Sequence, residues 1–173
     1  EGPFGETVRV AGVTDPASDG TGFVFRAHET DAWTLPALVA NGTLPADAAA
    51  LCSLAVERAA AGLIAGPRGA GKTTLCGALL WELPPSARTV VVEDTPELPV
   101  AALHDAGRDA QAVRTEADDG PALSATEALR TALRLGDGAL VVGEVRGEEA
   151  TTLYEPMRVG AASTAVLGTT PGA

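Results

Sequence analysis

The chain contains short apolar runs that alternate with longer segments of helical character. The apolar runs are bounded by turn-forming or charged residues: 63–65, 89–93, 139–143 and 163–167. Runs of this length and composition predict strands that are buried on both faces of a sheet. The segments that follow or separate them predict helices: 73–81, 124–135 and 147–158. Strands that alternate with helices predict an α/β fold with a mostly parallel β-sheet.

The beginning of the chain has a different pattern, in which apolar and polar residues alternate. Residues 8–13 and 22–27 alternate in this way, and the segment 15–22 between them is rich in Gly, Asp, Ser and Pro. Alternation predicts strands, and the intervening composition predicts a turn. We therefore expect residues 1–31 to form a β-hairpin or the end of a preceding domain, and residues 32–173 to form the main domain.

Local signals mark the start of several helices. Thr34 precedes a short helix whose first turn contains Pro36, a residue that suits this position because its nitrogen carries no hydrogen. A longer helix is expected over residues 45–60. Ser124 and Glu127 form a capping box, in which each side chain accepts a hydrogen bond from the backbone of the other residue.

Composition and charge limit the classes of function. The formal net charge is −11, and the acidic residues are spread along the chain. Nucleic-acid-binding proteins and proteins that bind anionic membrane surfaces need clustered basic residues, so neither is an expected direct partner. An acidic chain with a single lysine resembles the proteins of salt-loving organisms, although an ordinary acidic soluble protein fits as well.

Cysteine and histidine residues give no sign of a metal site. Cys52 and Cys76 lie on apolar faces of expected helices, so we expect them to pack in the core. His28 and His104 are isolated and do not have zinc-binding spacing. We expect neither a membrane span nor a signal peptide. Both ends look cut, which suggests a fragment that is truncated at its C-terminus.

Residues 66–74 carry the strongest chemical signal. They match the P-loop pattern G-x-x-x-x-G-K-[ST] between an expected strand and an expected helix. The residues are Gly66, Pro67, Arg68, Gly69, Ala70, Gly71, Lys72, Thr73 and Thr74. Glycines let the backbone N–H groups approach phosphate oxygens at the helix N-terminus. Lys72, the single lysine, would reach the β- and γ-phosphates, and the Thr73 hydroxyl would bind Mg²⁺, so the expected ligand is ATP with Mg²⁺.

Acidic residues follow two of the expected strands. Glu144 follows the strand at 139–143 and is a candidate for binding Mg²⁺ or for ordering the attacking water. Glu93 ends the strand at 89–93, and Glu97 follows shortly after; either carboxylate could polarise a water in line with the γ-phosphate. Ligands of parallel sheets bind beyond the carboxyl ends of the strands, which is where these acids are expected. Each acid taken alone could equally be a solvated turn residue.

Arginines are a further candidate group, because phosphoryl transfer needs positive charge that often comes from a neighbouring subunit. Arg26 lies on the N-terminal β segment, Arg134 on the helix before Glu144, and Arg146 two residues after Glu144. For each of them, a surface ion pair is an equally good interpretation.

Several stretches resemble the secretion ATPases of type II and type IV systems, a family that includes archaeal members and the motors of pili and archaella. Residues 66–75 match its Walker A motif, and residues 91–98 resemble its aspartate box. Residues 133–135 and 141–147 resemble its Walker B region. The resemblance covers about residues 22–169, and the aspartate box and the Gly-Glu-Val-Arg-Gly run are more specific than the P-loop alone.

The resemblance implies a RecA-like P-loop NTPase domain that hydrolyses ATP within a hexameric ring. It implies a membrane platform protein as partner, and a cytoplasmic location at the inner face of the cell membrane. It makes Glu97 the favoured water-activating acid, with Glu93 as the next candidate. It also makes Glu144 the Walker B acid, which would bind the metal together with Thr73, and Arg26 a candidate for contacting nucleotide across the subunit interface.

The end of the chain departs from the family pattern. The family carries a histidine box after the last strand expected here, whereas this chain has Pro171 at the histidine position. The alternative function is therefore a ring-forming scaffold that binds nucleotide but hydrolyses it weakly or not at all. A small-molecule kinase with the same loop is a third candidate, but it would need a lid and an acceptor pocket that the sequence does not indicate.

Overall fold

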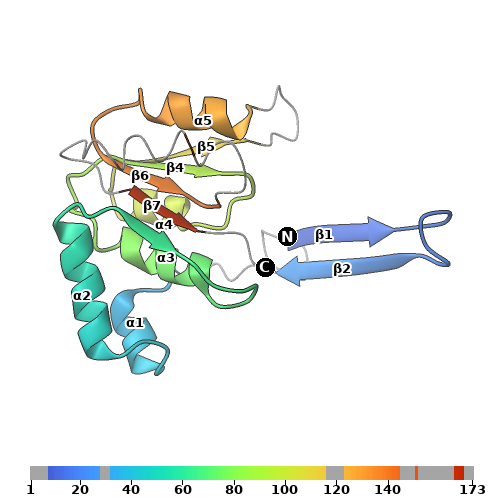
Figure 1. Ribbon diagram of the computed structural model, residues 1–173, viewed down its shortest axis with the longest axis horizontal. Helices are drawn as coiled ribbons and strands as arrows, with labels where there is room; N and C mark the ends of the chain where they lie inside the picture. Colours follow the sequence, from blue (N-terminus) through green and yellow to red (C-terminus); the bar gives the residue numbers. More distant parts are fainter. Residues whose placement is uncertain (1–7, 28–31, 116–122, 145–150, 152–165, 170–173) are drawn as a thin grey trace. The chain divides into compact units, whose positions relative to one another are not determined.

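The chain folds into two compact units. They comprise residues 1–32 and residues 33–173, and each has its own β-sheet (Figure 1). The computed structural model describes residues 8–27, 32–115, 123–144, 151 and 166–169.

The first unit contains a β-hairpin, which confirms the strands predicted from alternation. Strands β1 (Val8–Val13) and β2 (Gly22–Ala27) pair antiparallel along their whole length. Phe23 and Phe25 lie on one face of β2 with their ring centroids 6.3 Å apart. An added Cβ at Gly12 would lie 2.7 Å from a ring carbon of Phe23, so a larger residue at this position of β1 would displace that exposed ring.

The second unit contains a five-stranded sheet in the order β3-β7-β6-β4-β5 (Figure 1). Every pair of neighbouring strands is parallel, which confirms the predicted α/β class. The strands are β3 (Gly62–Ile64), β4 (Thr89–Glu93), β5 (Ala110–Arg114), β6 (Ala139–Val142) and β7 (Val166–Thr169). Because β7 lies between β3 and β6, the segments that follow β3 and β6 start roughly 10 Å apart, two strand spacings.

Helices cover both faces of this sheet (Figure 1). The described helices are α1 (Leu35–Ala40), α2 (Ala46–Glu57), α3 (Lys72–Leu80), α4 (Val100–Asp105) and α5 (Ala125–Ala132). Along β4, Val91 belongs to the buried cluster that contains Cys76 of α3, whereas Val90 and Val92 belong to the cluster that contains Leu129 of α5. This alternation explains why β4 is a continuous apolar run. None of the described helices is long and apolar enough to cross a membrane.

Cys76 packs in the core, as its place on the apolar face of α3 predicts. Its side chain is fully buried, whereas Cys52 of α2 is only partly buried. Burial, with a smaller contribution from the charge of Glu93, raises the pKa of the Cys76 thiol to about 12. The thiol is therefore neutral near pH 7 and acts as a small apolar side chain.

The predicted helix caps are present. The Thr34 side chain accepts a hydrogen bond from the backbone N–H of Ala37 at the start of α1. At the start of α5, Ser124 and Glu127 form the complete capping box. These ends were predictable because each cap depends on residues that are only three apart in the sequence.

One helix prediction needs correction, one helix was missed, and one predicted helix lies outside the described residues. Helix α5 ends at Ala132 rather than at residue 135, because the chain turns towards Gly136, whose φ is 134°. Arg134 therefore lies beyond the helix rather than on it. Helix α4 was not predicted, because its six residues are too few for a helical pattern to stand out. The predicted helix at 147–158 falls almost entirely on residues that are not described.

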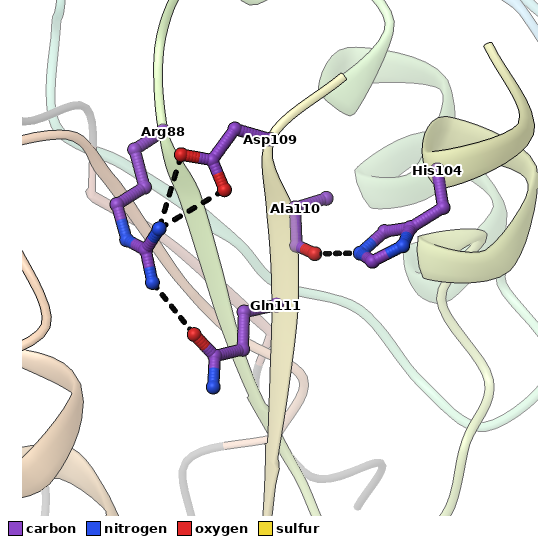
Figure 2. Close-up of polar contacts among 5 residues, drawn as sticks. All are labelled: Arg88, His104, Asp109, Ala110 and Gln111. Carbon is purple, nitrogen blue, oxygen red and sulfur yellow. Dashed lines mark hydrogen bonds and ion pairs between the residues drawn. The ribbon is translucent and has the colours of Figure 1, made fainter. Parts of the chain in front are cut away.

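Polar contacts at the amino ends of β4 and β5 attach the edge strand β5 (Figure 2). Arg88 donates from Nη1 to both carboxylate oxygens of Asp109 at 3.0 Å, and from Nη2 to Oε1 of Gln111 at 2.6 Å. His104 of α4 donates from Nε2 to the backbone carbonyl of Ala110. Arg88 and His104 thus have structural roles at the end of the sheet opposite to the carboxyl ends of the strands.

Candidate nucleotide-binding site

Three strands end at the edge of the sheet where the candidate residues lie. Strand β3 leads into the loop at residues 66–74, β4 ends at Glu93, and β6 leads to Glu144. Because the strands are parallel, these ends lie on the same edge, which is where open α/β sheets bind ligands. The fold therefore brings the loop and the segments that carry the acids to one side of the domain.

The glycines of the loop have conformations that favour glycine. Gly69 and Gly71 have φ values of 75° and 82°, in the left-handed region that other residues rarely adopt. At Gly66, an added Cβ would lie 3.2 Å from the Cβ of Ala70, so the loop closes tightly on itself there. The backbone N–H of Ala70 donates to the carbonyl of Pro67 at 3.2 Å. The spacing of the glycines is thus required by the path of the backbone.

Lys72 closes this loop from the first residue of α3. Its Nζ donates to the carbonyl oxygens of Gly66 at 2.9 Å and Pro67 at 3.0 Å. The ammonium group is therefore held against the loop, beside the N-terminus of α3. Free N–H groups and the helix dipole favour anions at a helix N-terminus, and a positive side chain next to them adds to this preference.

Arg108 secures the other end of α3, a contact that sequence reasoning missed. Its guanidinium donates to the backbone carbonyls of Leu83 at 2.9 Å and Trp81 at 3.0 Å, and more weakly to that of Leu80 at 3.5 Å. It also lies over the ring of Trp81, 5.3 Å from the centroid. A cation at the C-terminal carbonyls stabilises a helix. No local pattern marks Arg108, because it comes from the turn after α4.

A contact between Thr73 and Glu97 joins the loop to the segment after β4. The Thr73 hydroxyl donates to a carboxylate oxygen of Glu97, with an Oγ1 to Oε2 distance of 3.4 Å. Both side chains are half-buried. A hydroxyl and a carboxylate that lie side by side next to a phosphate-binding loop can together bind a hydrated metal ion or a water molecule.

Glu93 occupies a different environment from Glu97. It is the last residue of β4 and is only 5% exposed. Its Oε2 accepts hydrogen bonds from the backbone N–H groups of Glu97 at 3.1 Å and Leu98 at 3.2 Å. Burial raises the pKa of the Glu93 carboxyl, and these two bonds and the charge of Arg114 offset only part of that effect. The charge of Glu97 raises the pKa further.

The raised pKa of Glu93 predicts how stability depends on pH. The carboxyl is more easily ionised in the unfolded chain, where its ordinary value is 4.5, than in the folded protein. Its contribution to stability is therefore complete below that value and is lost as pH rises through the raised pKa. Glu93→Gln removes this titration, so the variant should gain stability relative to the wild type as the pH rises.

Urea denaturation of both proteins at pH values of about 4 and about 8 would measure this difference. A wild type that becomes relatively more stable at the higher pH would contradict the prediction.

Glu144 follows β6 after a glycine that packs closely on β4. The backbone N–H of Gly143 donates to the carbonyl of Val92 at 2.8 Å. An added Cβ at Gly143 would lie 3.3 Å from the Cβ of Glu93, so glycine leaves room for that side chain. Glu144 itself is half-buried at the carboxyl edge of the sheet.

The structure describes the side chain of only one of the three candidate arginines. Arg134 is exposed in the turn between α5 and β6. Arg26 lies in β2 of the first unit, but its side chain is outside the described part of the structure. Arg146 and Pro171 also fall outside the described residues. Their proposed relation to nucleotide therefore remains a prediction from the sequence.

The oxygen donors at this edge fit Mg²⁺. Magnesium prefers hard oxygen ligands, keeps several waters and usually takes only one or two protein ligands beside substrate phosphates. The Thr73 hydroxyl beside the Glu97 carboxylate, with Glu144 on the same edge, matches that sparse donor set. Within the described residues there is no group of three or more His, Cys, Asp or Glu side chains of the kind that binds zinc.

A comparison with protein families agrees with this geometry. Residues 5–170 match the family described as "Type II/IV secretion system protein". The chain belongs to this family. The match covers the hairpin, the P-loop and all three candidate acids, so the resemblance stated from the sequence is confirmed.

Two curated proteins are similar in sequence to this chain. A "Putative conjugal transfer protein" of Mycobacterium tuberculosis is 36% identical over 160 residues, which is 92% of this chain and 45% of that protein. The type IV secretion system protein PtlH of Bordetella pertussis is 42% identical over 97 residues, 56% of this chain and 28% of its own length. The chain thus spans less than half the length of these relatives.

Two solved structures of ATPases share the fold. The VirB11 ATPase of the Brucella suis type IV secretion system has a TM-score of 0.61 at 23% identity, over 98% of this chain and 55% of that chain. The Legionella pneumophila ATPase DotB has a TM-score of 0.64 at 19% identity, over 96% of this chain and 42% of that chain. These matches support the predicted RecA-like P-loop fold.

Proposed function

We propose that the chain is the ATP-binding and ATP-hydrolysing motor domain of a type II/IV secretion or pilus-type assembly ATPase. The observation that carries this proposal is the P-loop closed by Lys72, with the Thr73 hydroxyl lying against the Glu97 carboxylate. A phosphate-binding loop beside a positioned carboxylate can both hold a triphosphate and act on the water next to it.

Binding begins at the loop. The backbone N–H groups of residues 69–74 and the Lys72 ammonium donate hydrogen bonds to the oxygens of the β- and γ-phosphates, in place of the water molecules that occupy the loop without nucleotide. Lys72 gives up its bonds to the Gly66 and Pro67 carbonyls, or shares them, as it turns to the phosphates. Thr73 and Glu144 would hold Mg²⁺. When bound, this ion neutralises charge on the phosphate oxygens.

Hydrolysis then depends on the acids. Glu97 is half-buried and directed towards Thr73, so its carboxylate is in position to orient a water molecule and accept its proton. Glu144, which follows the neighbouring strand β6, would help to hold the metal ion, which would supply positive charge next to the phosphates. Positive charge for the transition state comes from an arginine of a neighbouring subunit, for which Arg26, Arg134 and Arg146 are the candidates.

The partners follow from the family. We propose that the full-length protein forms a ring of identical subunits, hexameric as in the family pattern, and acts on a membrane platform protein of a secretion or filament system. Its location would be cytoplasmic, at the inner face of the cell membrane. The relatives named for type IV secretion and conjugal transfer support this assignment.

A nucleotide-binding scaffold is the second candidate. It is favoured by Pro171, which stands where the family carries a histidine. Proline has no side-chain donor for a phosphate oxygen, so a phosphate sensor at this position would be lost. Such a protein would bind ATP and assemble but turn it over slowly.

Measuring ATP affinity together with phosphate release separates the two candidates. For a motor domain, we expect saturable ATP binding and Mg²⁺-dependent phosphate release that is abolished by chelation of the metal. Tight binding without measurable phosphate release would favour the scaffold. Absence of binding by ATP, ADP and a non-hydrolysable analogue would contradict both candidates.

A further inference from the structure

Glu93 is a buried carboxylate that takes no part in the ATP binding and hydrolysis proposed above. It ends β4, a strand whose every residue is buried, and its side chain is 5% exposed. A buried carboxylate is unfavourable unless its oxygens accept hydrogen bonds. The bonds that Glu93 makes therefore indicate why this residue is accommodated here.

The Glu93 side chain accepts two backbone hydrogen bonds from one short segment. The Oε2 atom of Glu93 accepts from the N–H of Glu97 and from the N–H of Leu98, four and five residues further along the chain. The carboxylate therefore spans the turn at residues 94–98 and fixes the backbone on its far side. The backbone carbonyl of Glu93 also accepts from the N–H of Thr115 at 3.1 Å, which ties the start of the turn to the end of β5.

The turn is held on its other side by the core. Leu98 is 7% exposed and belongs to the buried cluster that contains Leu79 and Leu80 of α3. Glu97 directly precedes Leu98 and is itself bonded to Glu93 through its N–H, and its side chain accepts a hydrogen bond from the Thr73 hydroxyl at 3.4 Å. The Glu93 side chain thus holds the backbone of the residue whose own side chain reaches the P-loop.

Gly143, which follows β6, leaves space for the Glu93 side chain. An added Cβ at Gly143 would approach the Cβ of Glu93 to 3.3 Å and the Val92 carbonyl oxygen to 3.5 Å. The end of β6 therefore packs against Glu93 with no side chain between them.

We propose that Glu93 is a positioning residue that holds Glu97 against the P-loop, and that it does not itself activate water. The inference rests on the proposed ATPase function, in which Glu97 acts on the attacking water. It resolves a choice that the sequence leaves open, since either glutamate could be the acid. What Glu93 contributes is an oxygen that accepts two backbone bonds, so an amide oxygen at the same place can replace it.

Two substitutions at Glu93 test this role. Glu93→Gln keeps an acceptor oxygen of the same reach, so kcat should stay within about 10-fold of the wild type. Glu93→Ala removes the acceptor and frees the turn, and kcat should fall by about 100-fold, because small displacements of a reacting group have effects of this size. The KM for ATP should stay within about 3-fold in both variants, since the P-loop is unchanged. Val91→Ala, which truncates a buried residue of the same strand, controls for loss of core packing.

Amide hydrogen exchange gives a readout that does not depend on turnover. In the wild type and in Glu93→Gln, the amides of Glu97 and Leu98 should be protected, and in Glu93→Ala they should exchange about 10-fold faster or more. In Val91→Ala, their protection relative to the other amides of the turn should be retained. This measurement tests the anchoring even if the protein proves to be a scaffold without hydrolysis.

The outcomes distinguish the inference from the proposed function. If Glu93→Gln loses as much turnover as Glu97→Gln, Glu93 is itself the reacting acid and the inference is wrong. If Glu93→Ala keeps both wild-type turnover and protected amides, the carboxylate positions nothing. If the wild type shows no turnover but the amide pattern holds, the proposed function fails and the anchoring role stands.

Discussion

Replacing Lys72 with alanine is expected to weaken ATP binding by about 100-fold or more, which is the range for the loss of charge-assisted hydrogen bonds to phosphate. Lys72 is the single lysine of the chain, and its ammonium closes the P-loop through the carbonyls of Gly66 and Pro67. Alanine leaves the loop with its N–H groups but removes the charge that offsets the phosphates. The start of α3 should remain helical, because alanine favours helix.

The effect of Lys72→Ala should be visible by isothermal titration calorimetry with a non-hydrolysable ATP analogue and Mg²⁺. The matched control is Arg58→Ala, which also removes one positive charge but lies in an exposed position at the end of α2. Arg58→Ala should bind within about 2-fold of the wild type, because a single exposed charge away from the site is screened by salt. Unchanged affinity in Lys72→Ala, with the fold intact by circular dichroism, would refute the assignment of residues 66–74 as the nucleotide site.

The parts of the fold that the sequence predicts well are those specified by nearby residues. Strand β4 is recognisable because consecutive valines can be buried only between two layers of helices, and α5 because Ser124 and Glu127 cap it locally. The P-loop belongs to the same group. Its glycine spacing, with positive φ at Gly69 and Gly71, is a requirement of the backbone that is readable without any tertiary contact.

The parts that could not be predicted depend on contacts between distant segments. Arg108 supports the end of α3 from a turn far along the chain, and nothing in its neighbourhood in the sequence distinguishes it from a surface arginine. The sequence does not distinguish the roles of the two glutamates of the aspartate box, whereas the structure separates them by burial and by hydrogen-bond partners. Glu93 points into the protein and binds backbone, whereas Glu97 reaches Thr73.

Replacing Glu97 with glutamine is expected to reduce ATP turnover by about 100-fold to 10,000-fold, the range for loss of a general base, while ATP binding stays close to that of the wild type. Glutamine has nearly the same shape and can still accept the hydrogen bond from the Thr73 hydroxyl. It cannot accept a proton from water, so the chemical step is lost while the geometry is kept. Glu57→Gln, an exposed acid at the end of α2, is the matched control and should retain full turnover.

Phosphate release under saturating ATP, with affinity measured in parallel, separates this effect from a loss of binding. Because Glu97 belongs to a turn that Glu93 anchors, the Glu97→Gln and Glu93→Ala variants should not be additive: the double variant should turn over about as slowly as Glu97→Gln alone. Releasing the turn by Glu93→Ala should slow turnover little further once Glu97→Gln has removed the carboxylate that the turn holds in place. Wild-type turnover in Glu97→Gln would instead assign water activation to another group, and Glu144 would be the next residue to test.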